Sequence, residues 1–400
     1  MRATFLLRSF LWLACATLAL QSLASGVAQS TDATFHASTD PGLETAILPT
    51  LYPSSHAANL LVLGNGDVLC FWFSGTGEGE SGVGIVVSRL PKGSQTWQTP
   101  LLIDREDGKS YQNPVPFEDS HGRIWLFHTS QSAGKGQADA QVLKVWSDDG
   151  GRTWSKPEVV FAKPGSFTRQ PPVVMDDGAW LLPMYYTPSA GITKGATSNY
   201  SVVEISKDAG KNWHECRIPD SNGVVQPTVI KLGAKSYIAF FRSRYADWIY
   251  QSTSSDGCEW TAPAPTGLPN NNSSIQAARL TDGHLVIAFN NSSAPAGERK
   301  PQTAPRVPLS IALSKDNGKS WASVRDLETG TPDSSGSKHF PAHNGRDEYS
   351  YPSILQLPDG KILVAYTYRR DAIKAALFSE KWLEPGTTIG IFKPASARNH

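Results

Sequence analysis

Residues 147–154 read SDDGGRTW, and the phrase returns as SKDAGKNW at 206–213 and as SKDNGKSW at 314–321. A shorter copy, SSDGCEW, covers residues 254–260. The shared pattern is a Ser, an Asp two residues later, a Gly and a closing Trp. Ser and Asp side chains bond the backbone of tight turns, and Gly supplies the left-handed conformation that such turns require. The phrase therefore predicts one turn, used repeatedly, with a tryptophan that packs the turn onto a sheet.

Tryptophans also divide the chain into units of similar length. Successive members of the series are separated by 57, 59, 47, 61 and 61 residues: Trp97, Trp154, Trp213, Trp260, Trp321 and Trp382. Between them recurs an apolar segment, a turn and a second apolar segment, at 58–73, 114–128, 172–186, 227–241, 275–289 and 352–366. Asn-Gly, Asp-Gly and His-Gly pairs at most of these turns are typical of β-hairpins.

Six hairpins and six tryptophan closures predict an all-β fold, a six-bladed β-propeller with Asp-box turns. Residues 34–47 should add a strand to the last blade, because a propeller closes its ring in this way and hides its edges. A β-sandwich or a parallel β-helix fits less well. Units near 60 residues are too long for one coil of a β-helix and too regular for a sandwich.

The N-terminus predicts export. Arg2 and Arg8 flank the start of an apolar run at 10–20 that is too short to span a bilayer comfortably. We expect residues 1–28 to be a signal peptide and residues 29–400 to form one propeller domain. The protein would then be periplasmic or secreted, without stable membrane insertion.

Composition narrows the class of ligand. Lys and Arg number 37 against 36 Asp and Glu, so no overall basic field points to nucleic acid. Twelve Trp and twelve Tyr suit carbohydrate, whose apolar faces stack on aromatic rings. Cys70, Cys216 and Cys258 allow at most one disulfide, and a Cys216–Cys258 bridge is one candidate. No cluster has zinc-ligand spacing, so no metal or cofactor is expected.

The inner strand of each blade should start at the axis, about eight residues before the hairpin turn. The residues at these starts are all polar: His56, Asn113, Gln170, Gln226, Ser274 and Tyr351. Polar side chains converging on one axis indicate a binding site. Arg242 and Arg306 should bring positive charge to it, and we expect Arg169 and Arg370 to bind substrate there as well.

These phrases, the blade spacing and the strand starts resemble the sialidase superfamily, in particular its bacterial Asp-box branch, over nearly all of residues 29–400. The resemblance implies that Tyr351, in YPSILQLPDG, is the nucleophile. It implies that Glu80, in the loop GTGEGESGVG, is the general acid. It places Arg242 and Arg306 on two of the three arginines that grip the substrate carboxylate.

Two positions depart from the family pattern. His56 stands where the first arginine is expected, and Gln226 replaces the glutamate that deprotonates the tyrosine. An unperturbed phenol holds its proton until about pH 10, so Tyr351 needs another source of activation. His56, with an ordinary pKa near 6.5, is the nearest candidate base.

Three functions therefore remain open. The first is exo-acting hydrolysis, of sialidase type, of an acidic terminal sugar on an oligosaccharide or glycoconjugate. The second is a lyase or rhamnosidase acting on uronate-containing polysaccharide through His56 and Tyr351. The third is a glycan-binding propeller without catalysis. Residues 290–305 are expected to form a loop over the funnel mouth, and one of Tyr185 and Tyr186 to face the channel.

Overall fold

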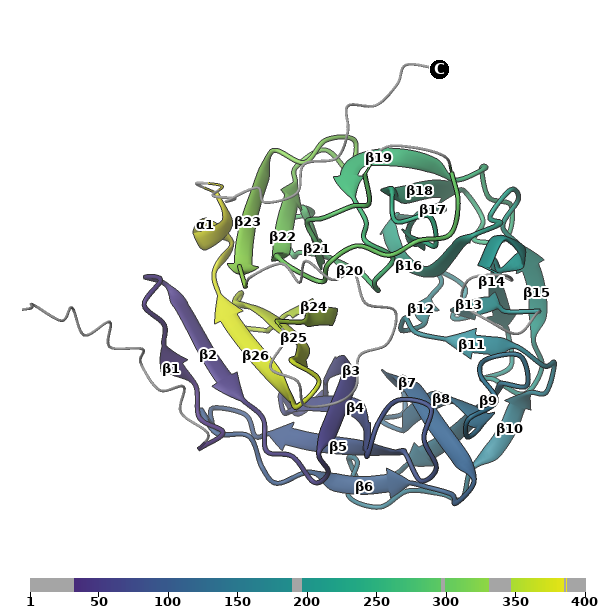
Figure 1. Cartoon of the computed structure of the whole chain (residues 1–400), viewed down its shortest axis with the longest axis horizontal. Helices are drawn as coiled ribbons and strands as arrows, with labels where there is room; N and C mark the ends of the chain where they lie inside the picture. Colours follow the sequence, from purple (N-terminus) through teal and green to yellow (C-terminus); the bar gives the residue numbers. More distant parts are fainter. Residues whose placement is uncertain (1–31, 189–195, 296–298, 331–346, 385, 387–400) are drawn as a thin grey trace, which may run out of the picture.

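Six small antiparallel sheets surround a central axis in the computed structural model of the chain (Figure 1). The structure describes residues 32–188, 196–295, 299–330, 347–384 and 386. The all-β, six-bladed propeller expected from the repeats is confirmed. The expected signal peptide, 1–28, lies outside the described residues. Within the described part, no helix is long and apolar enough to cross a membrane.

Each blade is one sheet, ordered from the axis outward. Blade one holds β3 (Ser54–Val62), β4 (Val68–Gly75), β5 (Gly84–Leu90) and β6 (Leu101–Asp104). Blade two holds β7 (Lys109–Glu118), β8 (Ile124–Ser132), β9 (Gln141–Ser147) and β10 (Glu158–Phe161). Blade three holds β11 (Ser166–Thr168), β12 (Val173–Val174), β13 (Trp180–Tyr186), β14 (Tyr200–Ser206) and β15 (His214–Arg217). Its inner strand is split, because β11 and β12 both pair with β13.

The second half of the ring follows the same plan. Blade four holds β16 (Val224–Gly233), β17 (Ser236–Ser243), β18 (Trp248–Ser254) and β19 (Ala264–Pro269). Blade five holds β20 (Gln276–Arg279), β21 (Leu285–Asn290), β22 (Leu309–Ser314) and β23 (Ser323–Glu328). Blade six holds β24 (Tyr349–Gln356), β25 (Ile362–Tyr368) and β26 (Ala372–Phe378). Two short helical segments, Ala196–Ser198 and α1 (Glu380–Leu383), complete the described elements.

The N-terminal segment closes the ring. Strand β2 (Leu43–Ile47) pairs antiparallel with β26, with Leu43 opposite Phe378 and Ile47 opposite Lys374. Strand β1 (His36–Ala37) pairs with β2 outside it. Blade six is therefore built from both ends of the described chain, as expected for residues 34–47. The pairing covers the outer edge of β26, which would otherwise expose unpaired backbone groups.

Apolar side chains fill the spaces between neighbouring blades. Between blades six and one, Leu363 and Ala375 pack with Trp72 and Val86. The described residues form equivalent clusters at the other five blade junctions. Because each sheet is buried on two faces, its strands are apolar on both sides, as in the buried run VLCFWFSG of β4. Polar residues accordingly concentrate at the axis and at the turns.

The repeated acidic turns lie at the outer part of the blades and share one hydrogen-bond pattern. Asp149 Oδ1 accepts the backbone N–H groups of Arg152 and Thr153, each at 2.9 Å, and the hydroxyl of Ser147 at 2.7 Å. Its Oδ2 accepts the Thr153 hydroxyl at 2.6 Å. Asp208 and Asp316 make the corresponding bonds in blades three and five.

The tryptophans that end these turns pack onto the preceding blade. The ring of Trp154 lies 5.8 Å from that of Phe71, and Trp321 lies 5.6 Å from Phe240, both edge to face. Gly318 in the same turn has a φ of +82°, and a Cβ there would lie 2.8 Å from Phe240. Glycine is thus required both for the turn and for this close approach. The repeated phrase joins adjacent blades in addition to closing its own.

A disulfide links blades three and four. Cys216 on β15 is bonded to Cys258 in the acidic turn after β18, with a Cα–Cα distance of 5.2 Å. The candidate pairing from the sequence is therefore present, and Cys70 is a buried free thiol.

Replacing Asp149 by Ala should destabilise the fold without affecting the site. The variant loses the side-chain acceptor of one turn, and we expect the free energy of unfolding to fall by about 1 kcal/mol. Thermal and denaturant unfolding measure this. Asp107→Ala, at an exposed position, is the control and should stay within about 0.5 kcal/mol of the parent. A loss of ligand binding by Asp149→Ala with unchanged unfolding would contradict a purely structural role.

Candidate functional site

A β-bulge interrupts the inner strand at the same point of four blades. The pairing skips two residues in each: Ala57-Ala58, Asn113-Pro114, Gln226-Pro227 and Tyr351-Pro352. The first residue of each pair is left-handed, with φ values of 62°, 50°, 56° and 52° in the same order. Non-glycine residues reach this region at a cost, and a bulge re-aims side chains. The same bulge therefore recurs in four blades, and in each it directs the side chain of its first residue toward the axis.

The bulges correct one sequence assignment. His56 was matched to the other strand starts, but the residue at the bulge of blade one is Ala57. His56 precedes the bulge by one residue and so corresponds to Ser350, not to Tyr351. The expected strand starts were placed at a fixed distance before each hairpin turn. A bulge shifts the pairing register without a characteristic sequence motif, so this offset could not be seen.

Tyr351 is surrounded by arginines. Arg242 Nη1 donates to the Tyr351 hydroxyl at 2.6 Å and to Gln226 Oε1 at 3.3 Å, and Arg242 Nε donates to Asn272 Oδ1 at 2.9 Å. The guanidinium carbon of Arg306 lies 5.2 Å from the centre of the phenol ring, and that of Arg242 lies 5.6 Å from it. These two arginines therefore meet at Tyr351, as the sequence predicted.

The charges around the phenol change its acidity. Burial alone would raise the pKa of Tyr351, but the positive charges of Arg242 and Arg306 outweigh burial and hold the pKa below its ordinary value of 10.0. The arginines thus favour the phenolate, which is the more nucleophilic form.

His56 is in ring contact with Tyr351. The two ring centres are 4.2 Å apart, and Phe73 lies 5.3 Å from His56 on another side. The His56 Nδ1 is hydrogen-bonded to the Thr367 hydroxyl at 2.7 Å. Burial, followed by the charge of Arg370 and other arginines, lowers the pKa of His56 well below 6.5. The imidazole is therefore neutral at neutral pH.

Sequence reasoning missed Glu348, which joins two of the predicted arginines. Its buried carboxylate accepts Arg306 Nη1 at 2.6 Å, Arg370 Nε at 2.8 Å and the Ser350 hydroxyl at 2.8 Å. Burial would raise the pKa of Glu348, but Arg306 and Arg370 lower it to about 2. It lies three residues before Tyr351, immediately ahead of β24, so its position in the sequence could have drawn attention to it.

The acidic loop of blade one reaches this cluster through Glu78. Arg370 Nη1 donates to Glu78 Oε2 at 2.6 Å. Glu80, the residue favoured by the sequence, is exposed, and its backbone N–H bonds the carbonyl of Gly77 at 3.1 Å. The role expected for Glu80 stays a prediction, whereas Glu78 is the loop carboxylate with a contact to the arginines.

Arg169 and Gln170 are held within the protein. Arg169 Nη2 donates to the carbonyls of Ala58, Tyr351 and Pro352 at 3.1–3.2 Å, and its Nε donates to Ser274 Oγ at 3.0 Å. Gln170 Nε2 donates to the Ile275 carbonyl at 2.6 Å. These contacts position the inner strands. Substrate binding by Arg169, Gln170 and the buried Asn113 stays a prediction.

Two further residues border the cluster in blades three and four. Tyr185 accepts a hydrogen bond from Gln226 Nε2 at 3.2 Å, whereas the Tyr186 hydroxyl bonds Glu204 at 3.3 Å on the sheet side. One tyrosine of the pair thus faces the channel, as expected. Arg244, two residues after Arg242 in AFFRSR, lies with its guanidinium carbon 6.0 Å from the Tyr185 ring centre. The sequence analysis did not single it out.

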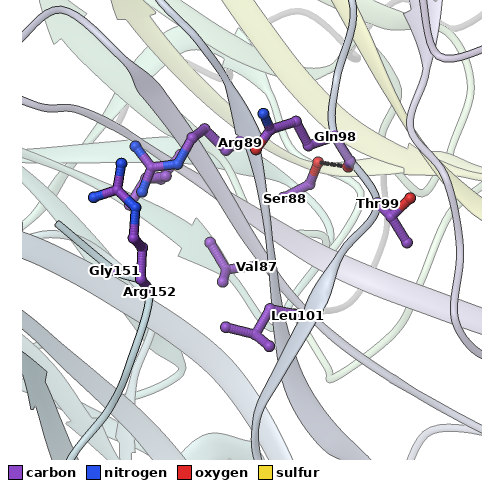
Figure 2. A pocket seen from close by; sticks show the side chains of 9 residues that line it. Val87, Ser88, Arg89, Gln98, Thr99, Leu101, Gly151 and Arg152 are labelled. Carbon is purple, nitrogen blue, oxygen red and sulfur yellow. Dashed lines mark hydrogen bonds between the residues drawn. The ribbon is translucent and has the colours of Figure 1, made fainter. Parts of the chain in front are cut away.

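Other polar groupings lie away from Tyr351. A shallow pocket between β5, β6 and the blade-two acidic turn is lined by Arg89, Gln98 and Arg152, and Ser88 Oγ donates to the Gln98 carbonyl at 2.6 Å beside it (Figure 2). At blade five, His284 Nδ1 lies 3.0 Å from Asp282 and 2.8 Å from Glu380. These three side chains are of the kinds that ligate metal ions, but here they pair with one another. Neither grouping touches the arginine cluster.

The family described as a BNR repeat-like domain matches residues 66–364. The chain belongs to this family. The match confirms the BNR-repeat part of the suspected family, and the matched residues include strands of all six blades. A search among curated proteins found no match.

Solved structures share the fold of this BNR repeat-like chain at low identity. A Hadza microbial sialidase has a TM-score of 0.66 at 16% identity, covering 83% of this chain and 67% of its own. The leech intramolecular trans-sialidase with 2,7-anhydro-Neu5Ac has a TM-score of 0.65 at 15% identity, with coverage of 84% and 69%. The Ruminococcus gnavus intramolecular trans-sialidase with oseltamivir carboxylate has a TM-score of 0.64 at 16% identity, with coverage of 87% and 99%. These similarities establish the fold.

The Glu348 contacts predict a pH-dependent contribution to stability. The folded pKa of about 2 lies below the ordinary value of 4.5, so the carboxylate stabilises the fold above pH 4.5, and this contribution is lost as the pH falls toward 2. Glu348→Gln should lower the free energy of unfolding by about 3 kcal/mol at pH 7. Urea unfolding at several pH values should show the difference from wild type shrinking below pH 4.5.

The control is Glu158→Gln, which removes an exposed carboxylate 3.7 Å from Lys144. It should change stability by less than about 1 kcal/mol at every pH. A Glu348→Gln variant with wild-type stability at pH 7 would show that the carboxylate is not held as described.

Proposed function

We propose that the chain is an exo-acting glycoside hydrolase of sialidase type that removes an acidic terminal sugar from an oligosaccharide or glycoconjugate. One observation carries the proposal: the hydroxyl of a buried tyrosine at a bulge on the propeller axis is hydrogen-bonded by Arg242 at 2.6 Å. A phenol in a field of guanidinium groups is suited to attack an anionic sugar, because a neutral or charge-compensated nucleophile avoids repulsion by the sugar carboxylate.

The arginines would also bind the carboxylate of the sugar. Arg242 and Arg306 lie beside the Tyr351 ring, and Arg370 is joined to Arg306 through Glu348. Charge-assisted hydrogen bonds between guanidinium and carboxylate are strong and directional. Glu348 holds Arg306 and Arg370 in place, so it acts as a positioning residue.

The reaction proceeds in two steps in this proposal. The Tyr351 oxygen forms a bond to the anomeric carbon while the glycosidic bond breaks, and a carboxylic acid on loop 75–84 gives its proton to the departing oxygen. The phenolic proton passes to His56, whose imidazole is neutral. Water then attacks the anomeric carbon, the loop carboxylate takes the water proton, and Tyr351 recovers its own. The net change is hydrolysis of one glycosidic bond.

The His56–Tyr351 contact supports a second candidate function. A buried imidazole 4.2 Å from a phenol ring could serve as a base and acid pair for β-elimination from a uronate, without a covalent intermediate. The products separate the candidates: elimination leaves an unsaturated uronide that absorbs in the near ultraviolet, hydrolysis frees the acidic sugar, and a glycan-binding protein leaves the glycan whole. We further propose that the protein is exported through residues 1–28.

Substitution at Tyr351 and His56 tests the hydrolase. Tyr351→Phe and His56→Ala should each lower kcat/KM on a fluorogenic sialoside by at least about 100-fold, because each removes a group that reacts or transfers a proton. Tyr349→Phe is the matched control on the same strand, since its hydroxyl bonds Asp347. Full activity in Tyr351→Phe would exclude Tyr351 as the nucleophile.

The loop acid is identified by comparing Glu78→Gln with Glu80→Gln. The contact of Glu78 with Arg370 places it nearer the arginine cluster, so we expect the larger fall in kcat for Glu78→Gln, by about 100-fold. A substrate with a good leaving group needs less protonation, and it should rescue the true acid variant selectively. Selective rescue of Glu80→Gln would assign the role to Glu80 instead.

A further inference from the structure

Five consecutive polar residues, NNNSS at 270–274, are buried in the connection from blade four to blade five. None of them is more than 2% exposed. They lie between β19 and β20. Buried polar side chains need hydrogen-bond partners, because an unpaired polar group is costly inside a protein. The partners of the three asparagines therefore show what this run holds together.

Two of the asparagines bond backbone groups. Asn270 Oδ1 accepts the N–H of Ser243 at 3.0 Å. Asn271 Oδ1 accepts the N–H of Ser273 at 3.0 Å, and its Nδ2 donates to the Pro305 carbonyl at 2.8 Å. These bonds shape the connection and fasten it to its neighbours, which is a structural role.

Asn272 bonds a charged side chain as well as backbone. Its Oδ1 accepts Arg242 Nε at 2.9 Å, and its Nδ2 donates to the carbonyls of Gln302 at 2.9 Å and Arg244 at 3.4 Å. An amide accepts at its oxygen and donates at its nitrogen, whereas a carboxylate only accepts. The φ of Asn272 is 65°, in the left-handed region that asparagine enters more readily than most residues. Side chain and backbone both favour asparagine here.

The amide nitrogen of Asn272 meets the segment 290–305, which was expected to form a loop over the funnel mouth. Apart from 296–298, this segment is described, and it lies against blade four. The N–H of Gln302 donates to the Arg244 carbonyl at 3.1 Å, while the Gln302 carbonyl accepts Asn272 Nδ2. Asn272 is therefore held from the side of this segment as well as from the axis.

The bond from Asn272 fixes the direction of Arg242. With Nε held there, Arg242 Nη1 meets Gln226 Oε1 at 3.3 Å and the Tyr351 hydroxyl at 2.6 Å. Asn272 and Gln226 are neutral, so neither cancels the charge of the arginine. Burial raises the pKa of Tyr351, and the charge of Arg242, followed by that of Arg306, outweighs it. The placement of Arg242 thus bears directly on the phenol.

We propose that Asn272 is a positioning residue of the site, which holds the Arg242 guanidinium against the Tyr351 hydroxyl without neutralising its charge. The inference rests on the proposed function and extends it with a residue that acts through Arg242. A carboxylate in this place would form an ion pair, as Glu348 does with Arg306. An ion pair would weaken the positive field at the phenol. The amide supplies orientation alone.

Three variants of the full chain test this. Asn272→Asp keeps the acceptor and the size but adds a negative charge beside Arg242. Asn272→Gly removes the side chain and suits the left-handed backbone. Asn271→Asp is the matched control, because it is equally buried in the same run and also loses a donor bond to a carbonyl, that of Pro305, but has no bond to Arg242. The ultraviolet absorbance of tyrosinate is followed in a pH titration, with Tyr351→Phe subtracted.

We expect Asn272→Asp to raise the pKa of Tyr351 by about one pH unit, because the added charge offsets that of Arg242. Asn272→Gly should raise it less, since the freed guanidinium spends part of its time turned away. Asn271→Asp should match wild type. In an Arg242→Met background, Asn272→Gly should cause no further change, because the effect passes through the arginine.

The pH profile of kcat/KM on a fluorogenic sialoside gives a second measurement. Its acid limb should move to higher pH in Asn272→Asp by the same amount, with activity recovered above it, whereas general damage to the site would lower activity at every pH. The other titratable groups that face the phenol are the same in all variants: His56, Glu78, Arg169, Tyr185, Arg244, Arg306 and Arg370.

Wild-type ionisation of Tyr351 in both Asn272 variants would overturn the inference. So would an equal shift in Asn271→Asp, or an undiminished effect of Asn272→Gly once Arg242 is gone. Failure of the hydrolase proposal looks different: the wild-type protein cleaves no sialoside, while the ultraviolet titration of Tyr351 still depends on Asn272.

Discussion

The hydrogen bonds from Arg169 to the inner strands are the interaction on which the rest of the structure depends. Four bulges release backbone carbonyls from strand pairing at the axis, and buried carbonyls need donors. One guanidinium meets those of Ala58, Tyr351 and Pro352. Gln276 ties the same region together, with Oε1 accepting the Ser353 hydroxyl and the Ile354 N–H, each at 2.7 Å. Tyr351 is thus held by its own backbone.

This axial network explains why the site can concentrate positive charge. A cluster of guanidinium groups repels itself, so it persists only where the backbone is rigid and some of the charge is compensated. Glu348 supplies compensation on the side of Arg306 and Arg370, whereas Arg242 has neutral acceptors. The site therefore has a neutralised side, in blades five and six, and an electropositive side, in blade four. An anionic ligand would be drawn toward the second.

The sequence was informative wherever a repeat fixed the spacing. The acidic turns, the hairpins, the closing strand and the Cys216–Cys258 pair follow from local chemistry repeated at regular intervals, and Tyr351 was found because its blade keeps the pattern. The offset at His56 could not be seen, because a bulge changes register by backbone conformation alone. Glu78 and Glu80 lie two residues apart on one loop, and the sequence does not show which of them contacts an arginine.

The closing strand has a consequence for how the chain folds. Residues of β2 and β26 that pair are more than three hundred positions apart, so the ring is sealed by one of the highest-separation contacts in the molecule. During synthesis, β2 emerges first and must wait for β26, leaving an open sheet edge until the ribosome has delivered the last blade. Closure of the ring by pairing of β2 with β26 should therefore be a slow step in folding. Before closure, neighbouring chains could exchange their β2 strands. Sealing makes the six blades one cooperative unit.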